Sequence, residues 1–147
     1  MKTGTQGVEL IKHYEGLRLK PYLCPAGIPT IGYGSTQYPD GRKVTLVDRP
    51  LTEEEADSLL EATLVPFERD VERMLEVKVT QRMFDALVSF AYNLGAAALR
   101  GSTLLKKLNQ GDKDGAAAEF GKWINAGGKP LPGLIKRRES EKRLFLS

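Results

Sequence analysis

The 147-residue sequence is poor in metal-binding and cross-linking residues, with one cysteine and one histidine. Cys24 has no partner for a disulfide within the chain, and Cys24 with His13 cannot supply the four ligands of a tetrahedral metal site. Long apolar runs are also missing. The first residues lack the apolar stretch of a secretory signal, and no segment approaches the roughly 18 uninterrupted apolar residues of a membrane helix. We therefore expect a soluble product that is made in the cytosol and has no membrane anchor.

The excess of positive charge is small and lies at one end of the chain. The net charge is +3, of which residues 129–147 carry +4 and residues 1–128 carry −1. The basic end suits a polyanion such as nucleic acid, a membrane surface or an anionic cell wall, or else a solvated helix face with Glu/Arg pairs. We expect no nucleic-acid partner, because residues 53–76 are acidic and no other segment has a basic face.

The N-terminal third of the sequence predicts one helix followed by short strands. Apolar residues at helical spacing predict a helix over about 5–14, and short runs broken by Gly and Pro clusters predict antiparallel strands within 17–48. Thr52 with Glu55 three residues later is a capping box that opens a long acidic helix. We expect Pro66 to kink or interrupt that helix.

The remainder of the chain reads as helix from residue 80 onward, with a last helix over about 134–145. The whole is one domain's worth of chain. The order of elements predicts an α+β protein of two lobes: a small N-terminal lobe with a short sheet over about 1–52, a connecting helix over about 53–78 and a larger helical lobe over about 79–147. Two lobes leave a cleft between them, which is a common ligand site.

Glu15 is the first candidate for chemistry. It is followed by Gly16 and so lies at the C-terminus of the first helix, where the helix dipole and partial desolvation beside Tyr14 favour the protonated carboxyl that a general acid needs. Cys24 and Thr30 lie in the following turn and strand, from which both can reach the end of the helix. On the residues alone, a solvated or capping glutamate is the other interpretation.

The spacing of these residues resembles a known family. Glu15 is followed by eight residues, Cys24, five residues and Thr30, which opens the motif Thr-Ile-Gly-Tyr-Gly. This pattern is similar to that of the phage-type lysozymes, the endolysins of glycoside hydrolase family 24. Further motifs follow in the family's order at residues 90–95, 101–105, 120–123, 126–128 and 133–141.

The resemblance implies hydrolysis of the β-1,4 bond between N-acetylmuramic acid and N-acetylglucosamine in peptidoglycan, with lysis of the host bacterium. Glycoside hydrolysis needs an acid for the leaving oxygen and a second group on the other face of the sugar. By resemblance Glu15 is the acid, Cys24 the second catalytic group and Thr30 the hydroxyl that positions a water. No metal or cofactor is implied.

Cys24 stands where many members of the family have aspartate. A free thiol has a pKa near 8.5, so Cys24 needs a neighbour such as Arg18 or Lys20 to raise its thiolate fraction at neutral pH. Without such a neighbour, Cys24 only helps to position the water and Glu15 provides most of the rate enhancement, or Cys24 is a small hydrophobic residue packed in the turn.

Two pairs near the end of the chain match further family positions. Tyr92 and Asn93 resemble an aromatic–polar pair that contacts the sugar, although a helix end is also a normal place for a capping Asn. Arg137 or Arg138 resembles the basic pair that forms an ion pair with the catalytic glutamate, here Glu15, and the sequence does not distinguish the two.

Two other functions share these features. A lytic transglycosylase uses the same acid but gives 1,6-anhydro ends, and a non-catalytic wall-binding module keeps the fold without needing the acid. The resemblance favours a monomeric endolysin that waits in the host cytoplasm until a holin admits it to the periplasm and cell wall. We expect no additional wall-binding domain, which favours a Gram-negative host.

Overall fold

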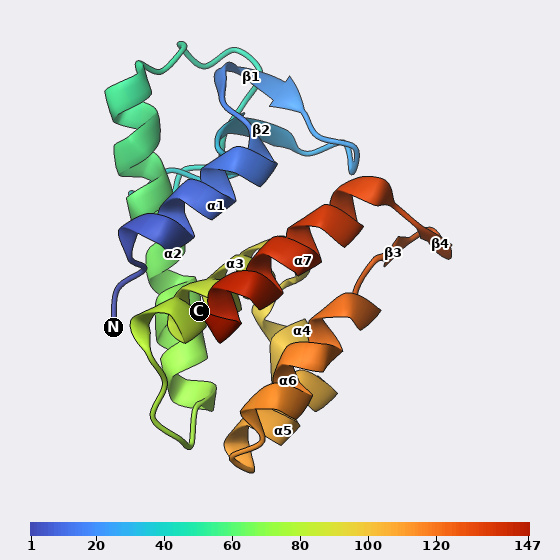
Figure 1. Cartoon of the computed structure of the whole chain (residues 1–147). Helices are drawn as coiled ribbons and strands as arrows, with labels where there is room; N and C mark the ends of the chain where they lie inside the picture. The colour runs from blue at the N-terminus through green and yellow to red at the C-terminus, as the bar shows by residue number, and fades with distance from the viewer. The chain divides into compact units, whose positions relative to one another are not determined.

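The computed structural model describes residues 1–147 and is a mixed helical fold with small antiparallel sheets (Figure 1). This confirms the predicted α+β class. The helices are α1 (Thr5–Glu15), α2 (Glu53–Met74), α3 (Gln81–Leu94), α4 (Ala96–Arg100), α5 (Thr103–Asn109), α6 (Lys113–Glu119), the 3₁₀ helix η1 (Phe120–Lys122) and α7 (Pro132–Leu146). The strands are β1 (Arg18–Leu23), β2 (Pro29–Gly32), β3 (Asn125–Ala126) and β4 (Lys129–Pro130). The chain forms two compact units, Ile11–Pro66 and Met1–Leu10 with Phe67–Ser147.

The unit Ile11–Pro66 is built around the β1–β2 hairpin. The two strands are antiparallel, with Tyr22 opposite Thr30, and a bulge interrupts their register between Arg18 and Tyr22. A proline within a strand cannot donate to the ladder, and Pro21 lies at this irregularity. Beneath the hairpin, a small core buries Ile31, Val44 and Leu59 against Tyr38 and Leu51.

Helix α2 begins with the predicted capping box. The hydroxyl of Thr52 accepts from the Glu55 N–H at 3.1 Å, and the Glu55 carboxylate accepts from the Thr52 N–H at 3.0 Å. Of the kink or interruption predicted at Pro66, the interruption is wrong, because α2 runs without a break from Glu53 to Met74, and the kink stays a prediction. Pro66 itself is exposed, and a proline leaves the carbonyl four residues earlier without its N–H partner.

The second unit is organised around α3. Nine consecutive residues of this helix, Met83 to Ala91, are buried, as expected of a helix surrounded by others. Helix α7 packs along α3 (Figure 1). Their contact is extended by an aromatic cluster in which the ring of Phe90 meets those of Phe120 and Trp123 edge-on at 5.7 and 5.4 Å.

The helix predicted to continue up to Gly127 and Gly128 ends earlier, and residues 125–130 are not helical. Here β3 and β4 form a two-residue antiparallel hairpin. Gly127 and Gly128 connect the strands with φ of 58° and 80°, a pair of left-handed conformations that suits a tight hairpin turn and that glycine adopts without strain.

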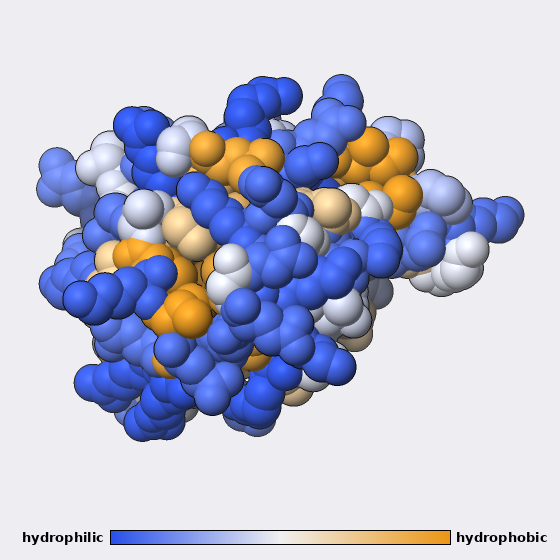
Figure 2. All heavy atoms as spheres, turned by 60° about the horizontal axis from the view of Figure 1, so that its bottom comes forward, coloured by the Kyte–Doolittle hydropathy of each residue, from blue (hydrophilic) through white to orange (hydrophobic).

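The face of the molecule drawn in Figure 2 is mostly hydrophilic, with hydrophobic side chains in separate patches. Exposed apolar side chains include Leu23, Ile28, Leu46 and Val47. No helix combines the length and apolar character needed to cross a membrane.

Candidate active site

Glu15 is the last residue of α1, as the sequence predicts. Gly16 follows with φ of 73°, and its N–H donates to the carbonyl of Lys12 at 3.0 Å, which ends the helix. The Glu15 side chain is half-buried. Its carboxyl therefore lies at the negative end of the helix dipole, in partial contact with solvent.

A tight turn between β1 and β2 brings Cys24 and Thr30 together. The N–H of Cys24 donates to the carbonyl of Ile28 at 3.1 Å, and the N–H of Gly27 donates to the carbonyl of Cys24 at 2.8 Å. Thr30 is 3% exposed, and its hydroxyl donates to the Ile28 carbonyl at 2.8 Å. The same hydroxyl lies within hydrogen-bond reach of the Cys24 thiol.

The turn lowers the pKa of the Cys24 thiol from its usual range. The main cause is a hydrogen bond from the Ile28 backbone, and other backbone groups of the turn add to it. Arg18 and Lys20, the neighbours that the sequence offered for this effect, are not among its causes, which are hydrogen bonds to the sulfur. Donors aimed at a thiol stabilise the thiolate in the same way as a nearby cation.

Tyr22 is a member of this site that the sequence analysis missed. Burial raises the pKa of Tyr22, the cation of Arg18 opposes the increase, and the negative charges of Glu15 and Cys24 add to it. Tyr22 is thus close enough to sense both candidate catalytic groups. Its ring also lies 4.5 Å from the guanidinium of Arg18. Its position opposite Thr30 in the predicted strand hairpin could have identified Tyr22 as a site residue. We call Glu15, Tyr22, Cys24 and Thr30 the hairpin cluster.

Tyr92 and Asn93 lie in the last turn of α3, as predicted, and both are half-buried. The ring of Tyr92 meets that of Phe67 edge-on at 5.3 Å. The helix is capped by Gly95, whose N–H donates to the Ala91 carbonyl. Asn93 does not serve as this cap, and its Oδ1 accepts from Arg138 Nη2 at 2.5 Å.

Arg137 and Arg138 are buried, and both bind Glu141. Arg137 Nε lies 3.3 Å from one carboxylate oxygen and Arg138 Nε lies 2.8 Å from the other. The hydroxyl of Ser89 donates to the same carboxylate at 2.5 Å. The sequence analysis offered a solvated helix face with Glu/Arg pairs for this end of the chain, whereas the pair of Arg137 and Glu141 is buried. The predicted ion pair from one of these arginines to Glu15 stays a prediction.

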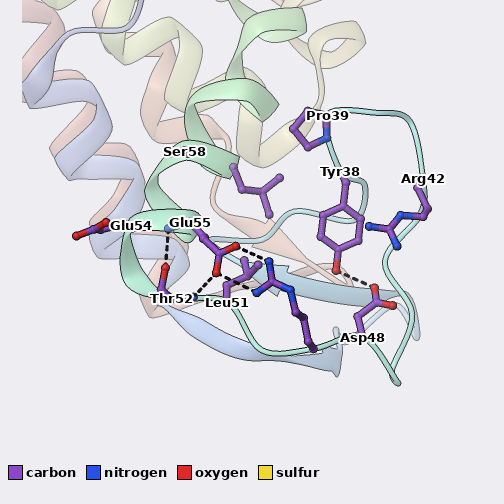
Figure 3. Close-up of a pocket in the computed structure, with 11 residues that line it drawn as sticks. Tyr38, Pro39, Arg42, Asp48, Leu51, Thr52, Glu54, Glu55 and Ser58 are labelled. Carbon is purple, nitrogen blue, oxygen red and sulfur yellow. Dashed lines mark hydrogen bonds and ion pairs between the residues drawn. The ribbon is translucent and has the colours of Figure 1, made fainter.

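A cavity of about 650 Å³ lies between residues 38–52 and the start of α2 (Figure 3). Its polar side chains bind one another: Tyr38 donates to Asp48 at 2.7 Å, and Arg49 forms two bonds with Glu55 at 3.0 and 2.6 Å. None of the predicted catalytic residues lines it. Because the charged groups of Asp48, Arg49 and Glu55 already bind partners within the cavity, we interpret their contacts as holding the loop of residues 38–52 in place. No group of three or more His, Cys, Asp or Glu side chains is placed to bind a metal ion.

Comparison with known proteins connects this arrangement to an enzyme family. The family model described as Phage lysozyme matches residues 12–141. The chain is 44% identical to the endolysin of Acyrthosiphon pisum secondary endosymbiont phage 1, over 100% of this chain and 99% of that protein. It is 45% identical to the endolysin of Bacillus phage B103, over 100% of this chain but 55% of that protein.

Among solved structures, the muramidase domain of SpmX from Asticaccaulis excentricus superposes with a TM-score of 0.86 at 39% identity, covering 99% of this chain and 98% of that one. Fold and sequence together define a lysozyme-type glycoside hydrolase. The chain belongs to the phage lysozyme family, and its activity is that of an endolysin, a muramidase that lyses the bacterial cell wall.

Proposed function

We propose that the protein cleaves the β-1,4 bond between N-acetylmuramic acid and N-acetylglucosamine with the hairpin cluster as its catalytic centre. Glu15 gives its proton to the leaving glycosidic oxygen. A water attacks the anomeric carbon and passes its proton to the Cys24 thiolate. The bond to the leaving oxygen breaks as the new carbon–oxygen bond forms, so the reaction needs no metal or cofactor.

The observation that carries this proposal is the hydrogen bonding around Thr30. The single hydroxyl proton of Thr30 is given to the Ile28 carbonyl at 2.8 Å, which leaves the lone pairs of Oγ1 available to accept. A water that donates one hydrogen to Thr30 and the other to Cys24 keeps a lone pair directed at the sugar. The lowered pKa of Cys24 enlarges the thiolate fraction that accepts the proton.

Mass spectrometry of fragments from purified peptidoglycan tests the assignment. The protein is expected to release fragments with reducing muramic ends, and Glu15→Gln to release none. Glu9→Gln is the matched control, because Glu9 is an exposed glutamate on the same helix. Anhydro ends would identify a lytic transglycosylase. Full activity of Glu15→Gln would remove Glu15 from the mechanism, and no fragments from the unaltered protein would indicate a wall-binding role.

The role of Cys24 is tested by comparing Cys24→Asp with Cys24→Ala. Aspartate supplies a carboxylate that can accept the proton, so it is expected to retain activity while alanine loses it. Equal rates for all three proteins would leave Cys24 as a packing residue of the turn.

In the other unit, we propose that Tyr92 and Asn93 contact the glycan and that Arg137 or Arg138 supports Glu15 through an ion pair. Substitution of Asn93 by Ala is expected to raise KM on soluble glycan chains more than it lowers kcat, since a lost contact to the bound sugar weakens substrate and transition state alike.

We further propose that residues 1–147 act as a single catalytic domain and as a monomer. Release from the host cytoplasm to the periplasm and wall is assigned to a holin, which acts on the membrane and forms no stable complex with the enzyme. Size-exclusion chromatography with light scattering tests the monomer. Expression with and without a membrane-permeabilising protein tests the route, and lysis that needs no such protein would refute it.

The basic end of the chain is proposed to assist attack from outside the cell. Arg137 and Arg138 are buried on Glu141, so the exposed cations of this end are Lys129 and three residues on α7. The variant that neutralises those three, Lys136, Lys142 and Arg143, is expected to lose lysis from outside while retaining activity on purified wall. Equal loss in both assays would exclude this role.

A further inference from the structure

The guanidinium of Arg138 is held from three sides. Its Nε lies 2.8 Å from Glu141 Oε1, its Nη2 donates to Asn93 Oδ1 at 2.5 Å, and its centre lies 5.2 Å from the middle of the Phe90 ring. The side chain is 1% exposed. A planar, buried group with these three neighbours has one orientation, so the atom it presents to Asn93 is fixed.

Glu141 is fixed in turn by its own neighbours. It is fully buried, Ser89 Oγ donates to its Oε2 at 2.5 Å, and Arg137 Nε lies 3.3 Å from the same oxygen. The carboxylate therefore spans the gap between α3 and α7 and cannot rotate without breaking these bonds. Its other oxygen, Oε1, is left for Arg138.

This chain of contacts fixes the polarity of the Asn93 amide. A guanidinium carries only donors, so the oxygen of the amide faces Arg138 and its NH₂ group, with two donors, faces away. An amide free to rotate would offer either an acceptor or a donor to a ligand. Asn93 as held here offers only a donor.

Stability alone does not account for the arrangement. Arg138 Nη1 is buried without a hydrogen-bond partner, and the N–H of Nε does not point straight at the nearby Oε1. A buried donor without a partner costs free energy, and apolar side chains often replace buried ion pairs without loss. Retaining an imperfectly satisfied guanidinium here is consistent with a role in holding Asn93.

We propose that Glu141 and Arg138 are positioning residues that fix Asn93 as a hydrogen-bond donor to an acceptor oxygen of the glycan. The N-acetyl carbonyl, hydroxyl and ether oxygens of the sugars are the acceptors of this class. The inference rests on the proposed function, in which Asn93 contacts the substrate. It adds the direction of the hydrogen bond and the two residues that set it.

Asn93→Asp separates this role from a structural one. Aspartate keeps the shape and pairs with Arg138, so the melting temperature is expected to stay the same or rise. Its second oxygen accepts but cannot donate, so KM on soluble glycan chains is expected to rise about 10-fold to 100-fold, with kcat within about threefold. A purely structural Asn93 would leave KM unchanged in this variant.

A double-mutant cycle tests whether Glu141 acts on KM through Asn93, which it does not contact directly. Glu141→Gln keeps the shape but loses the charge that orients Arg138, and it is expected to raise KM when Asn93 is present and to have no effect on KM in the Asn93→Ala background. Glu139→Gln is the matched control, because Glu139 is an exposed glutamate on the same helix. It makes the same change of charge outside this chain of contacts and is expected to leave KM unchanged.

A wild-type KM for Asn93→Asp, or KM effects of Glu141→Gln and Asn93→Ala that multiply independently, would overturn the proposal. If Glu141→Gln does not fold, the Asn93→Asp measurement decides alone. Failure of the proposed function gives a different result, because the unaltered protein would then release no fragments from glycan chains and this inference would fall with it.

Discussion

Removing the carboxylate of Glu141 tests how much the buried charge network contributes to the fold. Glu141 lies at 0% exposure between Arg137 and Arg138, which are 3% and 1% exposed. Burial raises the pKa of Glu141 while both arginines lower it, and burial lowers the pKa of Arg138. In Glu141→Ala two buried guanidinium groups lose the carboxylate that both of them contact.

Breaking a buried ion pair from one side costs about 3–5 kcal/mol, because the remaining charge is desolvated and unpaired. A domain of this size has a free energy of unfolding of about 5–15 kcal/mol, so the loss is a large share of the total. At about 2–4 °C per kcal/mol for a chain of this length, the melting temperature is expected to fall by roughly 6–20 °C.

Thermal unfolding followed by circular dichroism, with urea unfolding at 25 °C, measures both quantities. Glu139→Ala is the matched control, because Glu139 is an exposed glutamate on the same helix and its loss is expected to change stability by less than about 0.5 kcal/mol. A loss below about 1 kcal/mol for Glu141→Ala would refute the reasoning, since it would mean that the two arginines regain solvent or other partners at little cost.

Three further predictions concern the unit Ile11–Pro66. Because backbone hydrogen bonds of the turn lower the pKa of Cys24, iodoacetamide at pH 7 is expected to alkylate it faster than a free thiol, and equal rates would contradict this. Hydrogen bonds from Thr45 and Tyr38 lower the pKa of Asp48 to about 2, and burial with the Asp48 bond raises that of Tyr38 to about 12. The Asp48 contribution is therefore complete above pH about 4 and lost as pH falls through about 2, and the Tyr38 contribution is complete below pH about 10 and lost as pH rises through about 12. Asp48→Asn should reduce the acid-side dependence in urea unfolding measured across this range, leaving the part from Glu55, whose pKa is also lowered to about 2, and an unchanged pH profile would contradict the assignment. Pro66→Ala is expected to raise the free energy of unfolding, measured in urea, by about 2 kcal/mol. A proline inside a helix costs about 3 kcal/mol relative to alanine, and the greater freedom of the unfolded chain without proline takes back up to about 1 kcal/mol. A loss of stability would contradict this prediction.

The local elements followed from the sequence because their causes lie within a few residues. Thr52 and Glu55 are one helical turn apart, and both bonds of the capping box join them. Gly16 ends α1 at Glu15 because glycine adopts φ of 73° without strain. The interruption expected at Pro66 is absent because α2 is continuous through it, and sequence alone does not show that this side of the helix is exposed.

The sequence by itself determined the α+β class, the end of α1, the start of α2 and the spacing that brings Cys24 to Thr30 across one turn. Only the tertiary structure decided which charged side chains are buried and which partners they bind. Arg138 meets Asn93 from 45 residues away, and Glu141 meets Ser89 from 52 residues away. A spacing of four residues is the same for a solvated pair and a buried one. Which of the two forms depends on the distant helix that excludes water from the pair, and that is a property of how the chain packs.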